Sequence, residues 1–212
     1  MIAAAIKPDT KQRILDSAER LFADHGVAAT SLRTIIKDAQ VNLAAIHYHF
    51  HSKEELLDAV LMRRIEPVNR ERLEMLDAWG PNPSLEEVLE AFIAPAVRVR
   101  SSGERGGMSF VCLMGRIISE PGDRLPRMIR QHFRVILERF IPALHQAAPE
   151  LPTSELLWRL HFTVGAMAHT LRAGDEMRAI TDGLCDASDV EGVAKRLVAF
   201  AAAGFRAGVP HG

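Results

Sequence analysis

Side chains that could bind a polyanion gather in one short stretch, where His47, Tyr48 and His49 precede Lys53. Imidazole, phenol and ammonium groups all donate hydrogen bonds, and phosphate oxygens accept them. Arg33 lies a short distance upstream and adds a guanidinium, which can reach either a phosphate or a base edge. The residue types therefore point to contact with a nucleic acid, provided that the chain holds them on one surface.

The apolar spacing around this stretch predicts the elements that would position it. Residues 31–39 read as one helix, Gln40 and Val41 as a tight turn, and residues 43–50 as a second helix that Asn42 caps. This layout predicts a helix-turn-helix, in which the second helix enters the major groove of DNA. We expect the chain to read DNA through that helix.

The second helix offers few side chains for bidentate contacts with bases. It lacks Arg, Asn and Gln, but Ala44 and Ala45 would let its backbone come close to the bases and contact thymine methyl groups. We therefore expect sequence specificity to depend on DNA shape, methyl contacts and the positioning of phosphates.

Helical periodicity dominates the whole chain, and strand-type alternation is missing. The sequence predicts an all-α fold of about nine helices. It comprises an N-terminal three-helix domain over residues 1–52 and a C-terminal helical domain over 53–212, with the fourth helix as connector. Pro67 should kink or interrupt that connector. Expected helices cover residues 10–25, 31–39, 43–50, 52–66, 84–100, 108–119, 125–146, 154–173 and 188–208.

Residues 10–66 resemble the N-terminal domain of the TetR/AcrR family of prokaryotic one-component regulators. The resemblance rests on the spacing from Ile14 to Gly26, on Thr30-Ser31-Leu32-Arg33, and above all on Tyr48-His49-Phe50-x-Ser52-Lys53-Glu54-x-Leu56. It implies a dimeric, DNA-binding transcriptional regulator. Gln40 departs from the pattern, since the family usually has Gly there. If this position needs a positive φ, Gln costs on the order of 1 kcal/mol.

Pattern and resemblance together predict which residues contact the DNA operator. They are Arg33, Asn42, Ala44, Ala45, His47, Tyr48, His49 and Lys53.

The remaining helices should enclose a pocket for a small apolar effector and form a dimer face. Met and Phe are frequent in them, which suits an adaptable apolar cavity. Predicted pocket residues are Phe92, Ala96, Phe110, Met114, Ile117, Phe133, Leu137, Phe140, Trp158, His161 and Phe162. The last two helices have small residues that permit close packing, and the resemblance implies a four-helix bundle between two copies. Predicted interface residues are Leu160, Val164, Met167, Leu171, Leu197, Val198, Ala201 and Phe205.

The expected mechanism is a two-state one. Effector binding would shift the fourth helix and change the spacing of two recognition helices on a pseudo-palindromic operator. Arg116, a cation in an apolar helix, should pair with Glu120 or else with a ligand anion, and the former is favoured. A repressor is the expected form, and an activator or a helical adaptor that does not bind DNA are the alternatives.

Other classes of protein are disfavoured by composition and motifs. Cys112 and Cys185 show no metal or disulfide spacing, and no hydrolase, phosphate-loop or dinucleotide motif occurs. His47 and His51 could share a metal, but no further ligand completes a set, so neither a metal nor a cofactor is expected. The chain has no apolar run near 18 residues and no signal-like start. We expect a cytoplasmic, non-enzymatic protein without a membrane partner, located at the prokaryotic nucleoid when bound to DNA.

Overall fold

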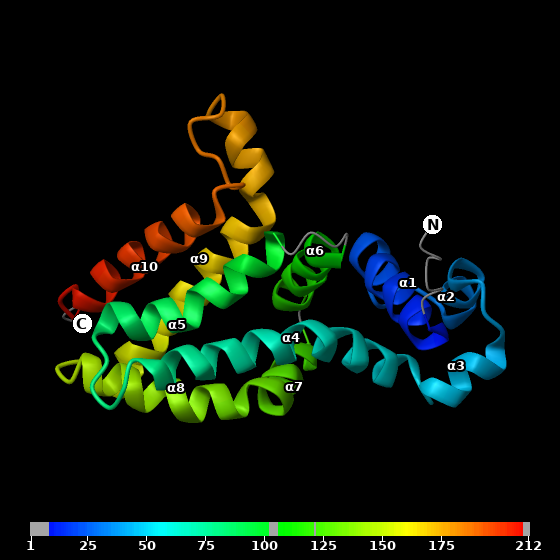
Figure 1. Ribbon diagram of the computed structural model, residues 1–212, viewed down its shortest axis with the longest axis horizontal. Coiled ribbons are helices and arrows are strands. Elements are labelled where there is room, and N and C mark those ends of the chain that lie inside the picture. Colours follow the sequence, from blue (N-terminus) through cyan, green and yellow to red (C-terminus); the bar gives the residue numbers. More distant parts are fainter. Residues whose placement is uncertain (1–8, 102–105, 121, 210–212) are drawn as a thin grey trace, which may run out of the picture.

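A computed structural model describes residues 9–101, 106–120 and 122–209 (Figure 1). These residues are helical throughout and contain no strand, so the predicted all-α fold is confirmed. The α-helices are α1 (Thr10–His25), α2 (Leu32–Ala39), α3 (Leu43–His49), α4 (Lys53–Ala78), α5 (Leu85–Arg98), α6 (Gly106–Ser119), α7 (Arg124–Met128), α8 (Arg134–Ala147), α9 (Thr153–Ile180) and α10 (Val190–Arg206).

Helices α1 to α3 form a head at one end of the molecule, and α4 runs from it along α5 and α8 (Figure 1). The head folds around the apolar stripe expected for α1, with Ile14 and Phe22 fully buried against Ile35 and Ile46. Gly26 ends α1 at a φ of 83°, as its position after His25 predicts. Local sequence signals therefore suffice to define the head.

Helix α4 continues through Pro67, so the prediction that this residue interrupts the helix is wrong. A proline removes one hydrogen bond to the carbonyl four residues earlier, which here is that of Arg63. Both halves of α4 are anchored by packing: Leu61 and Ile65 lie in the core shared with the head, and Leu76 lies in the core shared with α5. Burial on both sides of Pro67 holds the helix together across the missing bond.

The apolar core is divided in two, and α6 contributes to both parts. Phe110, Leu113 and Ile117 of α6 are buried with the head residues and the first half of α4, in what we call the head core. The second cluster, the body core, joins the second half of α4 with α5, α8, α9 and α10 and includes Val111 of α6. The division of the core therefore does not follow the chain boundary predicted at residue 52.

Arg116 of α6 ties that helix to the end of α1. Its Nε donates to the carbonyl of Ala23 (2.8 Å) and its Nη2 to the carbonyl of Asp24 (3.0 Å). These are carbonyls of the last turn of α1, where the helix dipole favours a cation. The expected partner Glu120 instead accepts a hydrogen bond from Arg124. The cation in the apolar helix is thus satisfied by a helix end rather than by a carboxylate.

A second tie joins α1 to α4 through a buried carboxylate. Glu19, with 1% of its side chain exposed, accepts a hydrogen bond from Arg63 Nη2 and lies 3.4 Å from Arg64 Nη2. Arg63 also donates to Asp16 (2.5 Å), one turn earlier on α1. Because a buried carboxylate is costly without a cation, this pairing fixes α1 at one register along α4.

Residues predicted as one helix over 125–146 form α7, a π-helical turn and α8 in direct succession. The π turn covers Ile129–Phe133 and leaves the His132 carbonyl as an acceptor for Asn69 Nδ2 of α4 (3.0 Å). Asp58, also on α4, accepts a hydrogen bond from Gln131 (2.7 Å) and meets His132 Nε2 at 2.8 Å. The π-helical turn therefore holds α7 and α8 against α4 through these hydrogen bonds.

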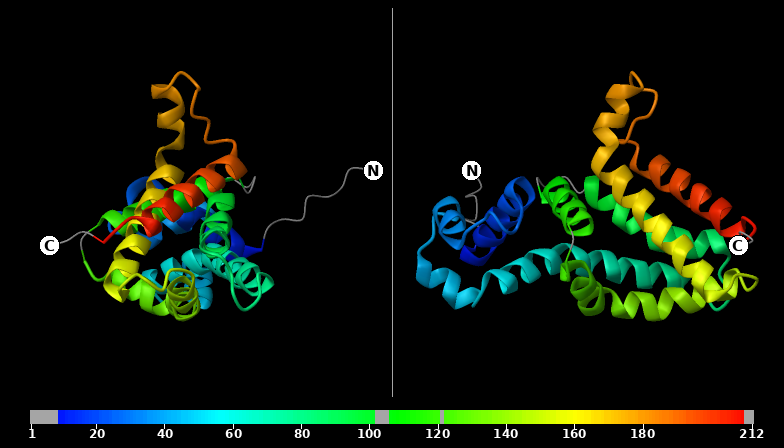
Figure 2. Two further views of the ribbon diagram at one scale, coloured as in Figure 1. Left: turned by 90° about the vertical axis from the view of Figure 1, so that its left-hand side faces the viewer. Right: turned by 180° about the vertical axis from the view of Figure 1, so that it is seen from behind.

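Helix α9 is longer than predicted and bends at the expected end. Ala173 has a non-helical φ/ψ of −99°/15°, after which the helix continues to Ile180. Figure 2 shows this last part and the loop to α10 projecting away from the body. Helix α10 begins at Val190 rather than at the expected residue 188, because Asp189 caps it through the Gly192 amide, and Glu191 pairs with Arg98.

The turn between α2 and α3 contains the backbone strain that its sequence implied. Gln40 adopts φ 53° and ψ 47°, the left-handed region that favours glycine. Its carbonyl accepts a hydrogen bond from Arg13 Nη2 of α1 (2.6 Å), which helps to hold the turn in place.

Replacing Gln40 with Gly should stabilise the head. Removing the β-carbon relieves on the order of 1 kcal/mol of left-handed strain, part of which is offset by the greater freedom of Gly in the unfolded chain. We expect a rise in Tm of up to about 2–4 °C for a chain of this size, measured by scanning calorimetry. Gln40→Ala retains the β-carbon and should give no rise; equal effects of both variants would contradict this account.

Replacing Arg116 with Ala should weaken the contact between α6 and the end of α1. The loss of a charged donor at two terminal carbonyls should lower the free energy of unfolding by about 1–2 kcal/mol, measured in urea. Arg124→Ala removes a neighbouring guanidinium whose i,i+4 pair with Glu120 is partly exposed, and should cost at most about 0.5 kcal/mol. If both variants lose the same free energy of unfolding, the hydrogen bonds from Arg116 to α1 contribute no more stability than the exposed ion pair of Arg124.

Candidate nucleic-acid interface and regulatory body

One face of helix α3 packs against the head, and the opposite face is exposed to solvent. Ile46 is fully buried and Phe50 nearly so, while Tyr48 is 82% exposed. Asn42 Oδ1 accepts the amide hydrogen of Ala45 (2.8 Å), which starts the helix and leaves its outer face to solvent. The helix lies at the far end of the head, away from the body (Figure 1). It is therefore a short protruding rod with one anchored face.

The structure brings most of the predicted DNA-contacting residues to one region. Ala44 and His47 are exposed on α3, Ala45 and His49 are half-buried beside them, and Arg33 is exposed on α2. The rings of Tyr48 and His49 meet edge to face at 4.9 Å. This surface presents small residues at the start of α3 and hydrogen-bonding rings at its end, which suits a groove of nucleic acid.

Lys53 differs from the other predicted contacts because its ammonium is occupied. Its Nζ donates to the carbonyls of Val27 (2.9 Å) and Thr30 (3.1 Å) and lies 3.5 Å from that of Ala28. An ammonium has three donors, and these carbonyls of the α1–α2 loop use them. Lys53 thus locks the loop to the start of α4, and its predicted phosphate contact would need these bonds to loosen.

The predicted pocket residues do not line one space. Phe92, Ala96, Leu137 and Phe140 belong to the body core or pack on it, whereas four others lie in or beside the head core: Phe110, Met114, Ile117 and Phe133. Trp158, His161 and Phe162 are exposed on the outer side of α9, with Trp158 stacked on Phe162 at 5.7 Å. These three residues need correction, because side chains on the outer side of α9 cannot line an internal pocket.

The predicted dimer residues also need correction. Leu160, Met167 and Leu171 of α9 face inward, and so do Leu197, Ala201 and Phe205 of α10; Val164 and Val198 are half-buried. Six of them fill the body core of a single chain, and Val164 and Val198 pack half-buried against it. Exposed apolar side chains of these helices lie on the opposite face, at Leu157, Trp158, Phe162 and Phe200, and beyond the bend of α9, at Met177 and Ile180. Both faces of α9 are apolar, so helical spacing alone could not distinguish its inward-facing residues from its outward-facing ones.

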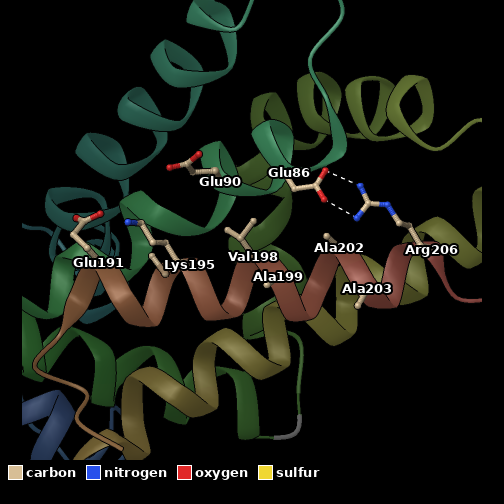
Figure 3. A pocket seen from close by; sticks show the side chains of 10 residues that line it. Glu86, Glu90, Glu191, Lys195, Val198, Ala199, Ala202, Ala203 and Arg206 are labelled. Atoms are coloured by element: carbon tan, nitrogen blue, oxygen red, sulfur yellow. Dashed lines mark hydrogen bonds and ion pairs between the residues drawn. The ribbon is translucent and has the colours of Figure 1, made fainter.

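A groove of about 600 Å³ lies along α10 beside α5 (Figure 3). Ala199, Ala202 and Ala203 of α10 are among its lining residues, and Glu86 faces Arg206 through two contacts of 2.6 and 2.8 Å. These hydrogen bonds from Arg206 hold the pKa of Glu86 below its usual value. Of the residues predicted for the pocket, none lines this groove, and the charges of Glu86 and Arg206 in its wall are already paired with each other.

Arg72 is a buried charge that the sequence analysis did not identify. It is 3% exposed and lies in the body core on α4. The inward positions of α4 run Leu61, Ile65, Asn69, Arg72 and Leu76, so two polar residues occupy the apolar stripe. Polar residues at such spacing are the signal that could have identified the position.

Two other kinds of site are missing from the described part of the chain. It contains no group of three or more His, Cys, Asp or Glu side chains placed to hold a metal ion. None of its helices is both long and apolar enough to cross a bilayer.

Known proteins resemble this chain in both parts. Residues 14–60 match the family of bacterial regulatory proteins called the tetR family, and residues 90–204 match the tetracyclin repressor-like C-terminal domain. The transcriptional regulator SrpR of Pseudomonas putida is 30% identical over 143 residues, which are 68% of this chain and 61% of that protein. The match therefore spans about three-fifths of the relative's length.

Solved structures share the fold along nearly the whole chain. The fatty acid degradation regulator FadR of Bacillus halodurans has a TM-score of 0.63 at 16% identity, covering 92% of this chain and 97% of its own. A complex of triclosan with SmeT, the repressor of a multidrug efflux pump of Stenotrophomonas maltophilia, has a TM-score of 0.61 at 23% identity and covers 91% and 90%. With a protruding α3 on an anchored head and family matches over both halves, the chain belongs to the TetR family of bacterial transcriptional regulators.

Proposed function

We propose that this protein is a homodimeric DNA-binding repressor that leaves its operator when a small effector binds in the body. The observation that carries the proposal is α3, which Ile46 and Phe50 anchor and which presents Tyr48 and His47 to solvent. A helix as short as α3, with one face packed on the head and the other exposed, fits the major groove. An activator of the same family remains the alternative.

Recognition would combine close approach with phosphate positioning. Ala44 lets the start of α3 reach the bases, while His47, Tyr48 and Arg33 donate to phosphates on either side of the groove. The remaining predicted contacts, Asn42, Ala45, His49 and Lys53, would set the position of α3 rather than read bases, since their groups are capped, half-buried or hydrogen-bonded.

A second copy of the chain would cover the outer face of α9 and α10. Leu157, Trp158, Phe162 and Phe200 are large apolar side chains with between 45% and 68% of their surface exposed. Gly165 lies among them on α9, and a β-carbon added to it would meet no atom within 4 Å, which leaves room for close helix packing. A self-complementary face of this kind gives a two-fold dimer with two heads.

The sign of regulation and the effector rest on relatives. SmeT is named as a repressor and binds triclosan, a small molecule with an apolar body. We extend both properties to this chain. The effector would act on the body, and the ties through Glu19 and Arg116 would pass movement of α4 and α6 to α1.

Replacing Tyr48 with Ala should weaken operator binding by removing a phosphate donor. We expect a loss of on the order of 1 kcal/mol, or about fivefold in Kd per head, measured by fluorescence anisotropy at fixed salt on a duplex selected from a random pool. Trp79→Ala removes an exposed aromatic at the far end of α4 and should leave Kd unchanged. Wild-type affinity in the Tyr48 variant would remove this residue from the interface.

Charges on the outer face of α9 should separate the dimer. We expect the double variant Trp158→Glu, Phe162→Glu to run as a monomer in light scattering and to bind the operator about 100-fold more weakly, because one head acts alone. Val135→Glu alters another exposed apolar position, on α8, and should remain dimeric. A dimeric double variant would place the interface elsewhere.

A further inference from the structure

A buried guanidinium in the body core has no charged partner. Arg72 donates from Nε to the Phe92 carbonyl (2.9 Å) and from Nη1 to Asn69 Oδ1 (3.2 Å), and its guanidinium carbon lies 4.5 Å from the centre of the Phe92 ring. All three partners are neutral. Within the described ranges no carboxylate pairs with it, and Nη2 has no hydrogen-bond acceptor.

Arg72 differs from two other buried or half-buried arginines in the described part of the chain. Arg159, 8% exposed, has Glu155 at 3.6 Å and three carbonyls near the end of α10. Arg63 has Glu19 and Asp16. Burial lowers the pKa of Arg72 to about 10, so the group remains charged at neutral pH. An unpaired charge in an apolar core is costly, and an anion placed beside it would offset that cost.

The surroundings of Arg72 define what kind of anion would fit. The Phe92 ring beneath the guanidinium packs edge to face on Phe140 at 5.4 Å, and Ala96 and Leu137 pack half-buried on the same core. One cation within apolar walls can neutralise one negative charge; a dianion would leave a buried charge uncompensated. The planar fork of a guanidinium matches a carboxylate through two parallel hydrogen bonds.

We propose that the effector is an amphiphilic organic carboxylate, with its carboxylate on the Nη atoms of Arg72 and its apolar part among Phe92, Phe140 and Leu137. This inference rests on the proposed function and refines the apolar effector expected from the sequence. The apolar part supplies burial, while Arg72 selects molecules that carry a single negative charge over neutral molecules of the same shape.

The same site has a connection to the head. A carboxylate on Nη1 would compete with Asn69 Oδ1, and Asn69 also donates to the His132 carbonyl in the π turn (3.0 Å). His132 in turn meets Asp58 at 2.8 Å, near the head end of α4. Freeing Asn69 would therefore loosen the π turn from α4 and allow the two to slide. The polar residues of the α4 stripe thereby link the site to the segment that carries the head.

Matched ligand pairs test the proposal on the full chain. The probes are decanoate and 4-phenylbutyrate, each with its primary amide, measured by isothermal titration calorimetry and by operator release in fluorescence anisotropy. We expect each carboxylate to bind about tenfold or more tightly than its amide and to release DNA at lower concentration. Equal binding by carboxylate and amide, or binding by neither pair, would overturn the proposal.

Variants assign the preference to Arg72. In Arg72→Met the amide should bind as before and the carboxylate should lose its advantage, while Arg72→Lys should retain part of it. The Met variant should fold with an unchanged or higher Tm, because it removes an uncompensated buried charge. Arg139→Met, at an exposed arginine paired with Asp77, should keep the full preference and so exclude attraction by surface charge.

The outcomes separate this inference from the proposed function. Operator binding by the ligand-free chain tests the regulator, and calorimetry with the probes tests the site without DNA. If the operator is bound but the carboxylate preference survives in Arg72→Met, the inference fails and the regulator stands. A collapse in stability of the Met variant would identify Arg72 as a structural brace and would equally refute the proposal.

Discussion

The position of α1 is the constraint on which the rest of the structure depends. Glu19 is buried in contact with Arg63 and Arg64 of α4, and Arg116 of α6 caps the last turn of α1. α1 forms the floor on which α2 and α3 pack, so these charged contacts set where the reading helix lies relative to the body. A buried carboxylate such as Glu19 admits few alternative partners, which makes its contact between α1 and α4 specific.

The apolar core that α6 shares with the head strengthens the connection between head and body. Leu113 and Ile117 of α6 are buried with the head, although the chain places them far beyond it. Any displacement of α6 in the body must therefore either carry α1 along or open the head core. Packed cores resist continuous deformation, so a movement of α6 should pass to α3 as a shift of the head as a unit.

Sequence reading succeeded where the determining signals are local. The Asn42 cap and the helical spacing of the apolar residues defined the helices of the head, and the family resemblance identified Gln40 as the position where a left-handed turn would be strained. It failed where a side chain chooses among distant partners. Arg116 donates to the carbonyls at the end of α1 instead of pairing with Glu120. It failed as well on α9, where inward Leu160 and outward Trp158 are both apolar, so that only the tertiary structure decides which one is covered.

The charges of the two halves differ in a way that matches their roles. In the head, Glu19 and Arg63 are paired, and Lys53 uses its donors on backbone carbonyls, so these buried or half-buried charges have partners. In the body, Arg72 lies among apolar side chains with neutral partners only. A ligand alters an equilibrium only through interactions that differ between the two states. An unpaired charge provides such a difference, because an anion gains most in the arrangement that frees the guanidinium from Asn69. In the proposed response, the body therefore supplies a charge without a counter-charge, whereas the charges that fix α1 in the head are paired.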